Sequence, residues 1–280
     1  MTDKLQFWNE QAKEHGSSDL ATAPDHYYRE LEIEKIRRVI EAHKPKTVLD
    51  VGCGNGYSTI QFAKEFPDTY FVGVDFSDEM IAEAEKAYPP TLSTNYRWVK
   101  GDVLSLSRDP DLEGDKFEMV ISTRCLINLD NWAEQKLGIL EMRKMLVDGG
   151  HLVLVENTKD GLEKLNAIRA SISLPEIKER WHNSYIPEQE LATFLTGTQG
   201  HLFNLVYTEN IGNMYYLASR VIYAKLAQDA GEEPSYDHPI NKIASQLPTL
   251  GEHYACSPNF MFILQKIDGD QKWASNQKPS

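Results

Sequence analysis

The stretch Val48-Leu49-Asp50-Val51-Gly52-Cys53-Gly54-Asn55-Gly56 decides the fold of this chain. A short β-branched and apolar run, Thr47–Val51, leads directly into three glycines at alternate positions. The run predicts a buried strand, and the glycines predict a tight turn, because glycine adopts positive φ without a steric cost. We therefore expect a strand, a glycine loop and then a helix from about Tyr57 to Glu65.

Strand and helix patterns alternate on both sides of this unit. An amphipathic helix is expected from Tyr27 to His43, and a helical stripe that ends at Leu146 precedes the fifth strand. This alternation predicts an α/β fold whose parallel sheet is covered by helices on both faces. The runs that predict strands are Thr47–Val51, Tyr70–Val74, Tyr96–Lys100, Phe117–Ser122, His151–Val155, Asn204–Glu209 and Asn259–Lys266.

The organisation of the chain follows from where this alternation is clear. Residues 1–24 have weak periodicity and are expected to form a mobile N-terminal segment or a lid. Residues 25–266 are expected to form one domain with a helical insertion at 157–200, since a segment of that size makes a poor core alone. The polar residues 267–280 predict a disordered tail.

Composition limits the partners of the protein. The 280 residues include 29 Lys and Arg against 42 Asp and Glu, a net charge of −13, which argues against nucleic acid and anionic membranes as partners. The N-terminus lacks a leader-like apolar run, and no stretch approaches a membrane span, so we expect a cytoplasmic protein, monomeric or homodimeric. The cysteines and histidines have no metal-ligand spacing, so no metal is expected.

Chemically informative residues follow the ends of five expected strands. The glycine loop, Asp75, Asp102, Thr123-Arg124 and Glu156 stand at these positions. Ligands of parallel α/β sheets bind outside the carboxyl ends of the strands, so we expect these residues to converge on one site.

The glycine loop departs from the phosphate-binding patterns. Tyr57 stands where the dinucleotide pattern GxGxxG requires its third glycine, and no lysine follows as in a P-loop. A glycine loop still lets a ligand approach the backbone closely. The carboxylate of Asp75, about 20 residues further on, suits the hydroxyls of a ribose.

Together these motifs resemble the class I S-adenosylmethionine-dependent methyltransferases. Besides the opening stretch, Gly73-Val74-Asp75-Phe76-Ser77, Gly101-Asp102-Val103 and the run from Leu146 to Leu152 match later signatures of that family. The segment Thr123–Leu129, with Trp181-His182-Asn183, resembles bacterial small-molecule methyltransferases. The resemblance implies a Rossmann-like, seven-stranded, mostly parallel sheet with a helical cap insertion and a reversed last strand at Asn259–Lys266.

The resemblance also implies S-adenosylmethionine as the cofactor. The glycines would lie against its methionine part, Asp75 would hold the ribose hydroxyls, and Asp102 would bind the adenine amino group beside Val103 and Met80. Asp50 would orient the loop. The expected cofactor-binding residues are Asp50, Gly52, Gly54, Gly56, Asp75, Phe76, Met80, Asp102, Val103 and Thr123.

Two residues are candidates for a catalytic base. Methyl transfer depends on holding the acceptor in line, and an alcohol must also lose its proton, which His182 or Glu156 could accept. The alternatives are that His182 is a packed or exposed histidine and that Glu156 caps a helix of the insertion.

Candidate acceptor-binding residues are mostly cations, which an acidic protein could present to an anionic substrate. They are Tyr28, Arg124, Arg169, Arg180 and Asn183. An ordinary helix start for Tyr28, a structural ion pair for Arg124 and solvated helix faces for Arg169 and Arg180 explain them equally well.

The expected function is methylation of a small molecule. The acceptor atom is expected to be an oxygen, on a sugar or on a phosphorylated or otherwise anionic metabolite. The alternatives are an N- or C-methyltransferase, an NAD(P)-dependent oxidoreductase and a non-catalytic protein that binds S-adenosylmethionine.

Overall fold

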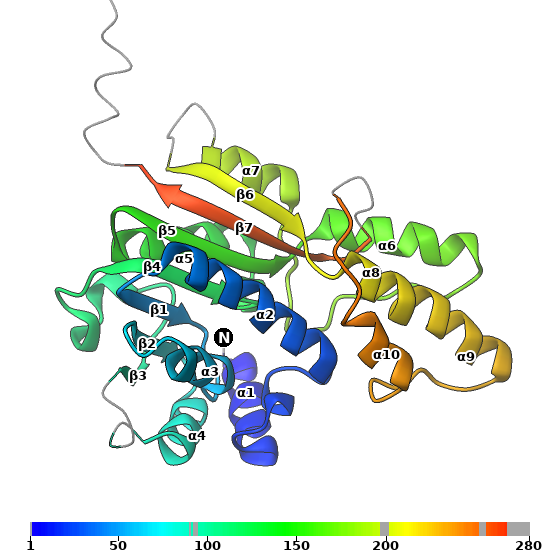
Figure 1. The fold of residues 1–280 in the computed structure, drawn as a ribbon, viewed down its shortest axis with the longest axis horizontal. Coiled ribbons are helices and arrows are strands. Elements are labelled where there is room, and N and C mark those ends of the chain that lie inside the picture. Colours follow the sequence, from blue (N-terminus) through cyan, green and yellow to red (C-terminus); the bar gives the residue numbers. More distant parts are fainter. Residues whose placement is uncertain (1, 90, 92–94, 197–201, 252–255, 268–280) are drawn as a thin grey trace, which may run out of the picture.

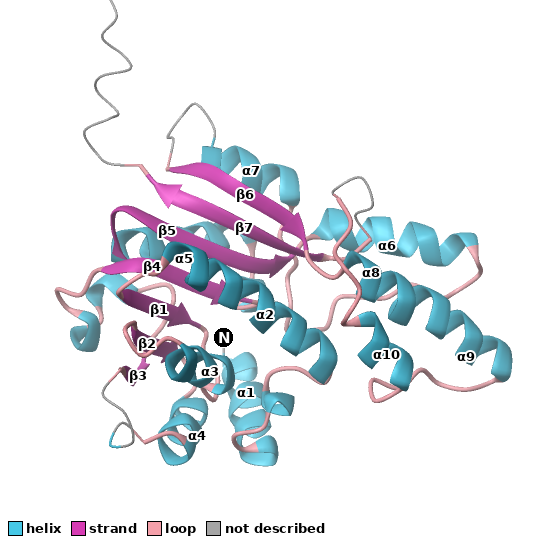
Figure 2. Ribbon diagram, in the orientation of Figure 1, coloured by secondary structure: helices cyan, strands magenta, loops and turns pink. Residues whose placement is uncertain are grey.

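A twisted seven-stranded sheet forms the centre of the computed structural model, which describes residues 2–89, 91, 95–196, 202–251 and 256–267 (Figures 1 and 2). Its strand order is β3-β2-β1-β4-β5-β7-β6; the pairs from β3 to β5 are parallel, and β7 runs antiparallel to both of its neighbours. The expected Rossmann-like sheet with a reversed last strand is confirmed. The strands are β1 (Thr47–Val51), β2 (Tyr70–Asp75), β3 (Tyr96–Lys100), β4 (Phe117–Thr123), β5 (Leu146–Asn157), β6 (Phe203–Asn210) and β7 (Asn259–Lys266).

Helices cover both faces of the sheet. The longer ones are α1 (Thr2–His15), α2 (His26–His43), α3 (Tyr57–Glu65), α4 (Asp78–Ala87), α5 (Trp132–Met145), α6 (Lys159–Ser171) and α7 (Glu188–Thr196). Near the C-terminal end, α8 (Asn213–Tyr216), a π-helical turn η6 (Leu217–Tyr223) and α9 (Ala224–Ala230) form one continuous element, followed by α10 (Pro239–Ala244). Short 3-10 turns are η1 (Asp19–Ala21), η3 (Leu106–Arg108), η4 (Pro110–Leu112) and η5 (Leu126–Asn128).

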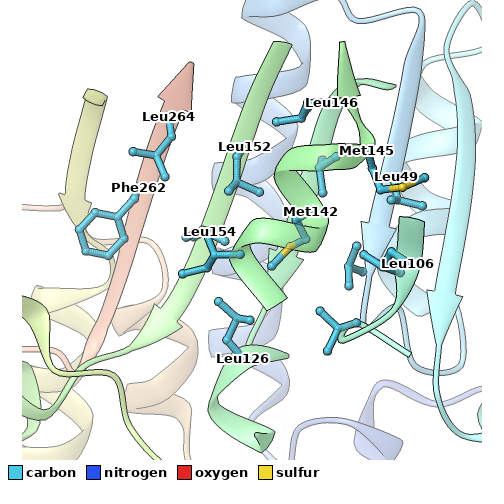
Figure 3. Close-up of a cluster of buried hydrophobic side chains, with 14 of the residues drawn as sticks. Leu49, Leu106, Leu126, Met142, Met145, Leu146, Leu152, Leu154, Phe262 and Leu264 are labelled. Atoms are coloured by element: carbon cyan, nitrogen blue, oxygen red, sulfur yellow. The ribbon is translucent and has the colours of Figure 1, made fainter. Parts of the chain in front are cut away.

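The two faces of the sheet contribute to separate hydrophobic clusters, because neighbouring residues of a strand point to opposite sides. Leu49 packs in the cluster that includes α5 and α7, whereas Val48 packs in the cluster that includes α2 and α3. Figure 3 shows the first cluster, where Met142 and Met145 of α5 lie over the leucines of β5. Strand β1 is buried on both faces, as its apolar sequence predicts.

Residues near the N-terminus form a helix that the weak sequence periodicity did not indicate. Helix α1 packs against α4, and its apolar contacts are few: Trp8 and Ala12 pack with Met80. Because so few positions are apolar, the helical repeat is hard to read from the sequence. Whether this segment moves as a lid stays a prediction.

The expected insertion packs as part of the main body. Leu162 of α6 and Leu191 and Leu195 of α7 belong to the same hydrophobic cluster as the sheet. Residues 197–200 of the insertion, and all of the expected tail except Ile267, lie outside the described residues. Figure 1 shows α6, α8, α9 and α10 gathered beyond one end of the strands.

Two further findings apply only to the described parts of the chain. None of the helices found there combines the length and the apolar character needed to cross a membrane. In the same ranges, no group of three His, Cys, Asp or Glu side chains is arranged to hold a metal ion. The expectation of metal-free catalysis stays a prediction.

Candidate functional site

A cavity of about 270 Å³ opens at the carboxyl edge of the sheet. Its walls come from the ends of β1, β2, β4 and β5, from α1 and α2, and from α6, α8 and η6. Gly52 and Gly54 of the glycine loop, Asp75, Asp102, Thr123 and Arg124 all line it, so these strand ends converge as predicted. Parts of the chain far apart in sequence thus enclose one space.

The half of the cavity next to β1 and β2 is built around Asp75. The backbone N–H of Gly54 donates to Asp75 Oδ2 at 2.9 Å, and that of Ser77 donates to Oδ1 at 2.9 Å. An ionised carboxylate has about four acceptor sites, so the side chain keeps acceptor capacity toward the cavity. Burial raises the pKa of Asp75 to about 6.

Next to this carboxylate, the cavity wall consists of apolar side chains and a second acid. Met80 and Val103 are buried and line the cavity together with Phe76. Asp102 accepts the backbone N–H of Leu104 at 2.9 Å through Oδ1, and no described residue donates to its Oδ2 atom. This wall suits a heteroaromatic base that donates a hydrogen bond.

Two expected cofactor residues do not line the cavity. The buried Asp50 carboxylate accepts the hydroxyl of Thr59 at 2.6 Å, which ties β1 to α3. Gly56 begins α3 at φ +76°, and a Cβ there would lie 2.6 Å from the ring of Trp98. The missing side chain of Gly56 makes room for Trp98, and its expected contact with a cofactor stays a prediction.

His182 is placed at the cavity by the loop between α6 and α7. The imidazole is 4% exposed, lies 4.5 Å from the ring of Phe7 in a stacked arrangement, and its Nδ1 atom has no partner among the described residues. Burial, with smaller contributions from the positive charges of Arg180 and Lys4, lowers the pKa of His182 to about 4. The imidazole is thus neutral at physiological pH and can accept a hydrogen bond.

Glu156 binds several donors around the start of η5. Its carboxylate accepts the Ser122 hydroxyl at 3.1 Å and the backbone N–H groups at the start of η5, those of Cys125, Leu126 and Ile127. Glu156 is fully buried and does not line the cavity. These donors engage both oxygens and hold the start of η5, and burial raises the pKa of Glu156 to about 8. Its expected role as a catalytic base stays a prediction.

Four of the five expected acceptor-binding residues line the cavity; Arg169 does not. Tyr28, Arg124, Arg180 and Asn183 are at its walls or rim. The buried guanidinium of Arg169 donates to the backbone carbonyls of Pro175 and Arg220. One of these hydrogen bonds fixes the backbone of η6, and the expected contact of Arg169 with a substrate stays a prediction.

Sequence reasoning missed the contribution of helix α1. Lys4 donates to the carbonyl of Asn128 at 2.8 Å and pairs with Asp130, and both Lys4 and Trp8 line the cavity. On the other side, Asn55 of the glycine loop donates to the carbonyls of Gly16 and Ser18. The adjacent aromatic pair Phe7-Trp8 in a polar segment was the available signal.

The C-terminal part of the chain also supplies cavity residues that the sequence did not indicate. Tyr216, Arg220 and Tyr236 line the acceptor half. Arg220 pairs with Asp25, and its guanidinium lies 4.8 Å from the ring centre of Tyr236. Nothing in the sequence pattern distinguishes this arginine from an exposed helical one.

Comparison with known proteins places these features in a family context. A family model described as "Methyltransferase domain" matches residues 42–191, more than half of the chain. A demethylmenaquinone methyltransferase of Deinococcus radiodurans is 36% identical over 116 residues, which cover 41% of this chain and 44% of that protein. A malonyl-[acyl-carrier protein] O-methyltransferase of Paenibacillus sp. is 27% identical over 114 residues, 40% of this chain and 39% of that protein. The chain thus spans less than half the length of these curated relatives.

Solved structures show a similar fold over a longer range. The N-methyltransferase NodS from Bradyrhizobium japonicum, crystallised with S-adenosyl-L-homocysteine, aligns with a TM-score of 0.55 over 93% of this chain and 99% of that one. The sequences are only 14% identical over this alignment, so the likeness concerns the fold.

Proposed function

The chain belongs to the methyltransferase domain family, and from this premise we propose that it transfers the methyl group of S-adenosylmethionine to an oxygen atom of a small molecule. The class I resemblance inferred from the sequence is confirmed by the family match and the fold. The observation that carries the proposal is a continuous cavity. It joins the wall of Asp75 and Asp102 to a second half that contains the buried imidazole of His182.

The cavity residues fit this cofactor. Asp75 keeps acceptor capacity for the two ribose hydroxyls, since backbone donors use one site on each of its oxygens. Asp102 has Oδ2 available for the adenine amino group, between the apolar surfaces of Met80 and Val103. The exposed backbone at Gly54 permits close approach of the methionine part.

When bound, S-adenosylmethionine would supply a methyl group on a sulfonium; a C–O bond to the acceptor would form as the C–S bond breaks, with sulfur keeping the electron pair. The walls of the cavity hold the acceptor close and aligned, which supplies much of the rate. Helix α1 is fastened to η5 through Lys4, and the turn after it is fastened to the glycine loop through Asn55, so that this segment shields the reacting groups from water.

His182 receives the hydroxyl proton in this proposal. Methylation of a neutral hydroxyl produces a protonated ether that is far more acidic than an imidazolium with a pKa of about 4. A weak base therefore suffices, and the neutral His182 side chain can accept the proton without losing its hydrogen bond to the acceptor. A nitrogen acceptor with a free lone pair needs no such group.

The cofactor part of the proposal is tested by calorimetry on the full chain with S-adenosylhomocysteine. We expect binding, with a loss of about tenfold or more in the Asp75→Asn variant, because a charged acceptor of two hydroxyls is replaced by a neutral amide. Absence of binding to the wild type would overturn the proposal. Tighter binding of NADH would favour the oxidoreductase alternative.

The oxygen-acceptor part is tested by turnover. Release of S-adenosylhomocysteine is followed with a panel of hydroxylated and aminated small molecules, and the active acceptor is then used with His182→Gln. We expect a loss of about 10²–10⁴-fold in kcat in that variant. His43→Gln, an exposed histidine away from the cavity, is the matched control. Full activity of His182→Gln would contradict the role of His182 as proton acceptor, and turnover of amines alone would contradict an oxygen acceptor.

A further inference from the structure

Three guanidinium groups meet at the acceptor half of the cavity. Arg29 of α2, Arg124 after β4 and Arg220 of η6 all line it. Arg124 lies 3.1 Å from Glu32 and Arg29 lies 3.6 Å from the same carboxylate, while Arg220 pairs with Asp25. Because each guanidinium carries five N–H donors, two carboxylates satisfy only a part of this donor set.

Two of the guanidinium donors have no hydrogen-bond partner in the described part of the chain. The Nε atoms of Arg29 and Arg124 are buried and have no acceptor among the described residues. Leaving a donor of a charged group unsatisfied costs free energy. Asn259 donates to Glu32 Oε1 at 3.0 Å, and Glu32 Oε2 lies within ion-pair distance of Arg29 and Arg124 without forming a hydrogen bond to a described residue.

Two other acids act on these arginines through their charge. Asp50 faces Arg29, and Glu156 faces Arg124. The oxygens of Asp50 and Glu156 are engaged by Thr59 and by the amides at the start of η5, and Glu156, with a pKa of about 8, is mostly protonated at neutral pH. Asp50 offsets some of the positive charge of Arg29, and neither acid satisfies the free N–H groups of the arginines.

The backbone holds two of these arginines in unusual conformations. Arg124 has φ +53°, a left-handed conformation that is unfavourable for a non-glycine residue. Its carbonyl accepts from the side chain of Asn128 at 2.7 Å and its N–H donates to Val155 at 2.8 Å, which fixes this geometry. Arg220 lies in a π-helical turn, a form of helix that is frequent at functional sites, and Arg169 binds its carbonyl.

The surface around the three arginines is apolar and aromatic. The guanidinium of Arg220 lies 5.7 Å from the ring centre of Tyr216 and 4.8 Å from that of Tyr236. Aliphatic side chains from α6 and the following loop complete this wall: Leu162, Leu165 and Ile177. A ligand here would place an apolar body against these groups and a polar group against the arginines.

We propose that Arg29, Arg124 and Arg220 form the subsite for a carboxylate of the acceptor, so that the substrate is a hydroxylated carboxylic acid with a compact apolar body. The hydroxyl in this inference rests on the proposed function, whereas the binding of the carboxylate does not depend on it. A planar carboxylate matches the fork of an arginine. The nearby charges of Asp25, Glu32 and Asp50 disfavour the second negative charge of a phosphate monoester.

Two of the three arginines lie outside the part of the chain that the family model matches. Arg29 precedes residue 42 and Arg220 follows residue 191. Recognition of the carboxylate is therefore a feature of this chain that the match to the family does not provide.

Binding of small probes to the full chain tests the subsite. Benzoate, benzamide and phenyl phosphate are titrated by calorimetry, with and without S-adenosylhomocysteine. We expect benzoate to bind at least tenfold more tightly than either of the others. Equal affinities, tighter binding of phenyl phosphate, or no detectable binding of benzoate would each overturn the inference.

Variants then assign the preference to residues. Arg220→Gln is expected to remove most of the preference for benzoate over benzamide and to leave the affinity for S-adenosylhomocysteine within about twofold. Arg38→Gln, an exposed arginine of α2 outside the cavity, is the matched control and should keep the preference. An unchanged preference in Arg220→Gln contradicts the subsite. Failure of the wild type to bind S-adenosylhomocysteine instead contradicts the proposed function, and the two outcomes are measured separately.

Discussion

Replacing Gly56 by alanine tests the packing role that the structure gives to the glycine loop. Gly56 has φ +76°, and a Cβ atom there would lie 2.6 Å from Trp98 Cη2. Gly149 has nearly the same backbone, φ +74°, but no heavy atom lies within 4 Å of the position of its Cβ. Both substitutions therefore place alanine at a positive φ, but only the one at position 56 brings a methyl group into contact with Trp98.

The expected magnitudes follow from these two terms. Left-handed alanine costs about 1–2 kcal/mol, and the lower entropy of the unfolded chain offsets about 0.4–1 kcal/mol of that cost. We therefore expect Gly149→Ala to lower the free energy of unfolding by about 1 kcal/mol. Forcing a methyl group against Trp98 adds about 1–3 kcal/mol, because the ring lies within the core and must shift. Gly56→Ala should thus lose about 2–4 kcal/mol.

Urea unfolding followed by far-UV circular dichroism measures both values, provided that the slopes of the transitions agree with that of the wild type. The comparison uses the difference between the variants, since errors of extrapolation are shared. Equal losses in the two variants would refute the reasoning, because they would mean that Trp98 does not oppose a side chain at position 56. A greater loss in Gly149→Ala would refute it more strongly.

Three further predictions concern titrating groups. With Asp75 at a pKa of about 6, affinity for S-adenosylhomocysteine should be constant above about pH 7 and fall as the pH drops through 6; an equal fall in Asp75→Asn, measured by calorimetry, would contradict this. The raised pKa of Glu156 means that its contribution to stability is complete below about pH 4.5 and is lost as the pH rises through about 8. The free energy of unfolding of Glu156→Gln, measured with urea, should therefore rise relative to that of the wild type over this pH interval. A parallel pH dependence of the two proteins would contradict the raised pKa. Phe7→Ala should expose the imidazole of His182 and raise its pKa from about 4 toward 6.5 in an NMR titration, and an unchanged value would show that Phe7 does not desolvate it.

The sequence alone was sufficient for the sheet and for the location of the site. The strands from β1 to β4 and β7 have local signals, namely a buried apolar run followed by glycine or by a polar residue, and their predicted bounds agree with the structure within one residue. The start of β5 was missed. Leu146, read as the end of a helical stripe, begins the strand instead, and its carbonyl accepts from Lys266 of the neighbouring strand. A contact over such a separation leaves no local pattern.

The assignment of roles within the site depended on tertiary structure. Asp75 and Asp102 follow strands in a parallel sheet, so topology places them at the cavity, and spacing was enough to identify them. Glu156 stands at an equivalent position, yet the amides of η5, some thirty residues earlier, bind its carboxylate and turn it away. The donors of Arg169 are likewise engaged by backbone carbonyl groups. Arg220, in contrast, lines the cavity from a π-helical turn. Sequence thus determined which residues arrive at the carboxyl edge, because strand periodicity is local. Only the tertiary structure decided which of their polar atoms remain free for a ligand, because the hydrogen-bond partners that compete for those atoms come from distant segments.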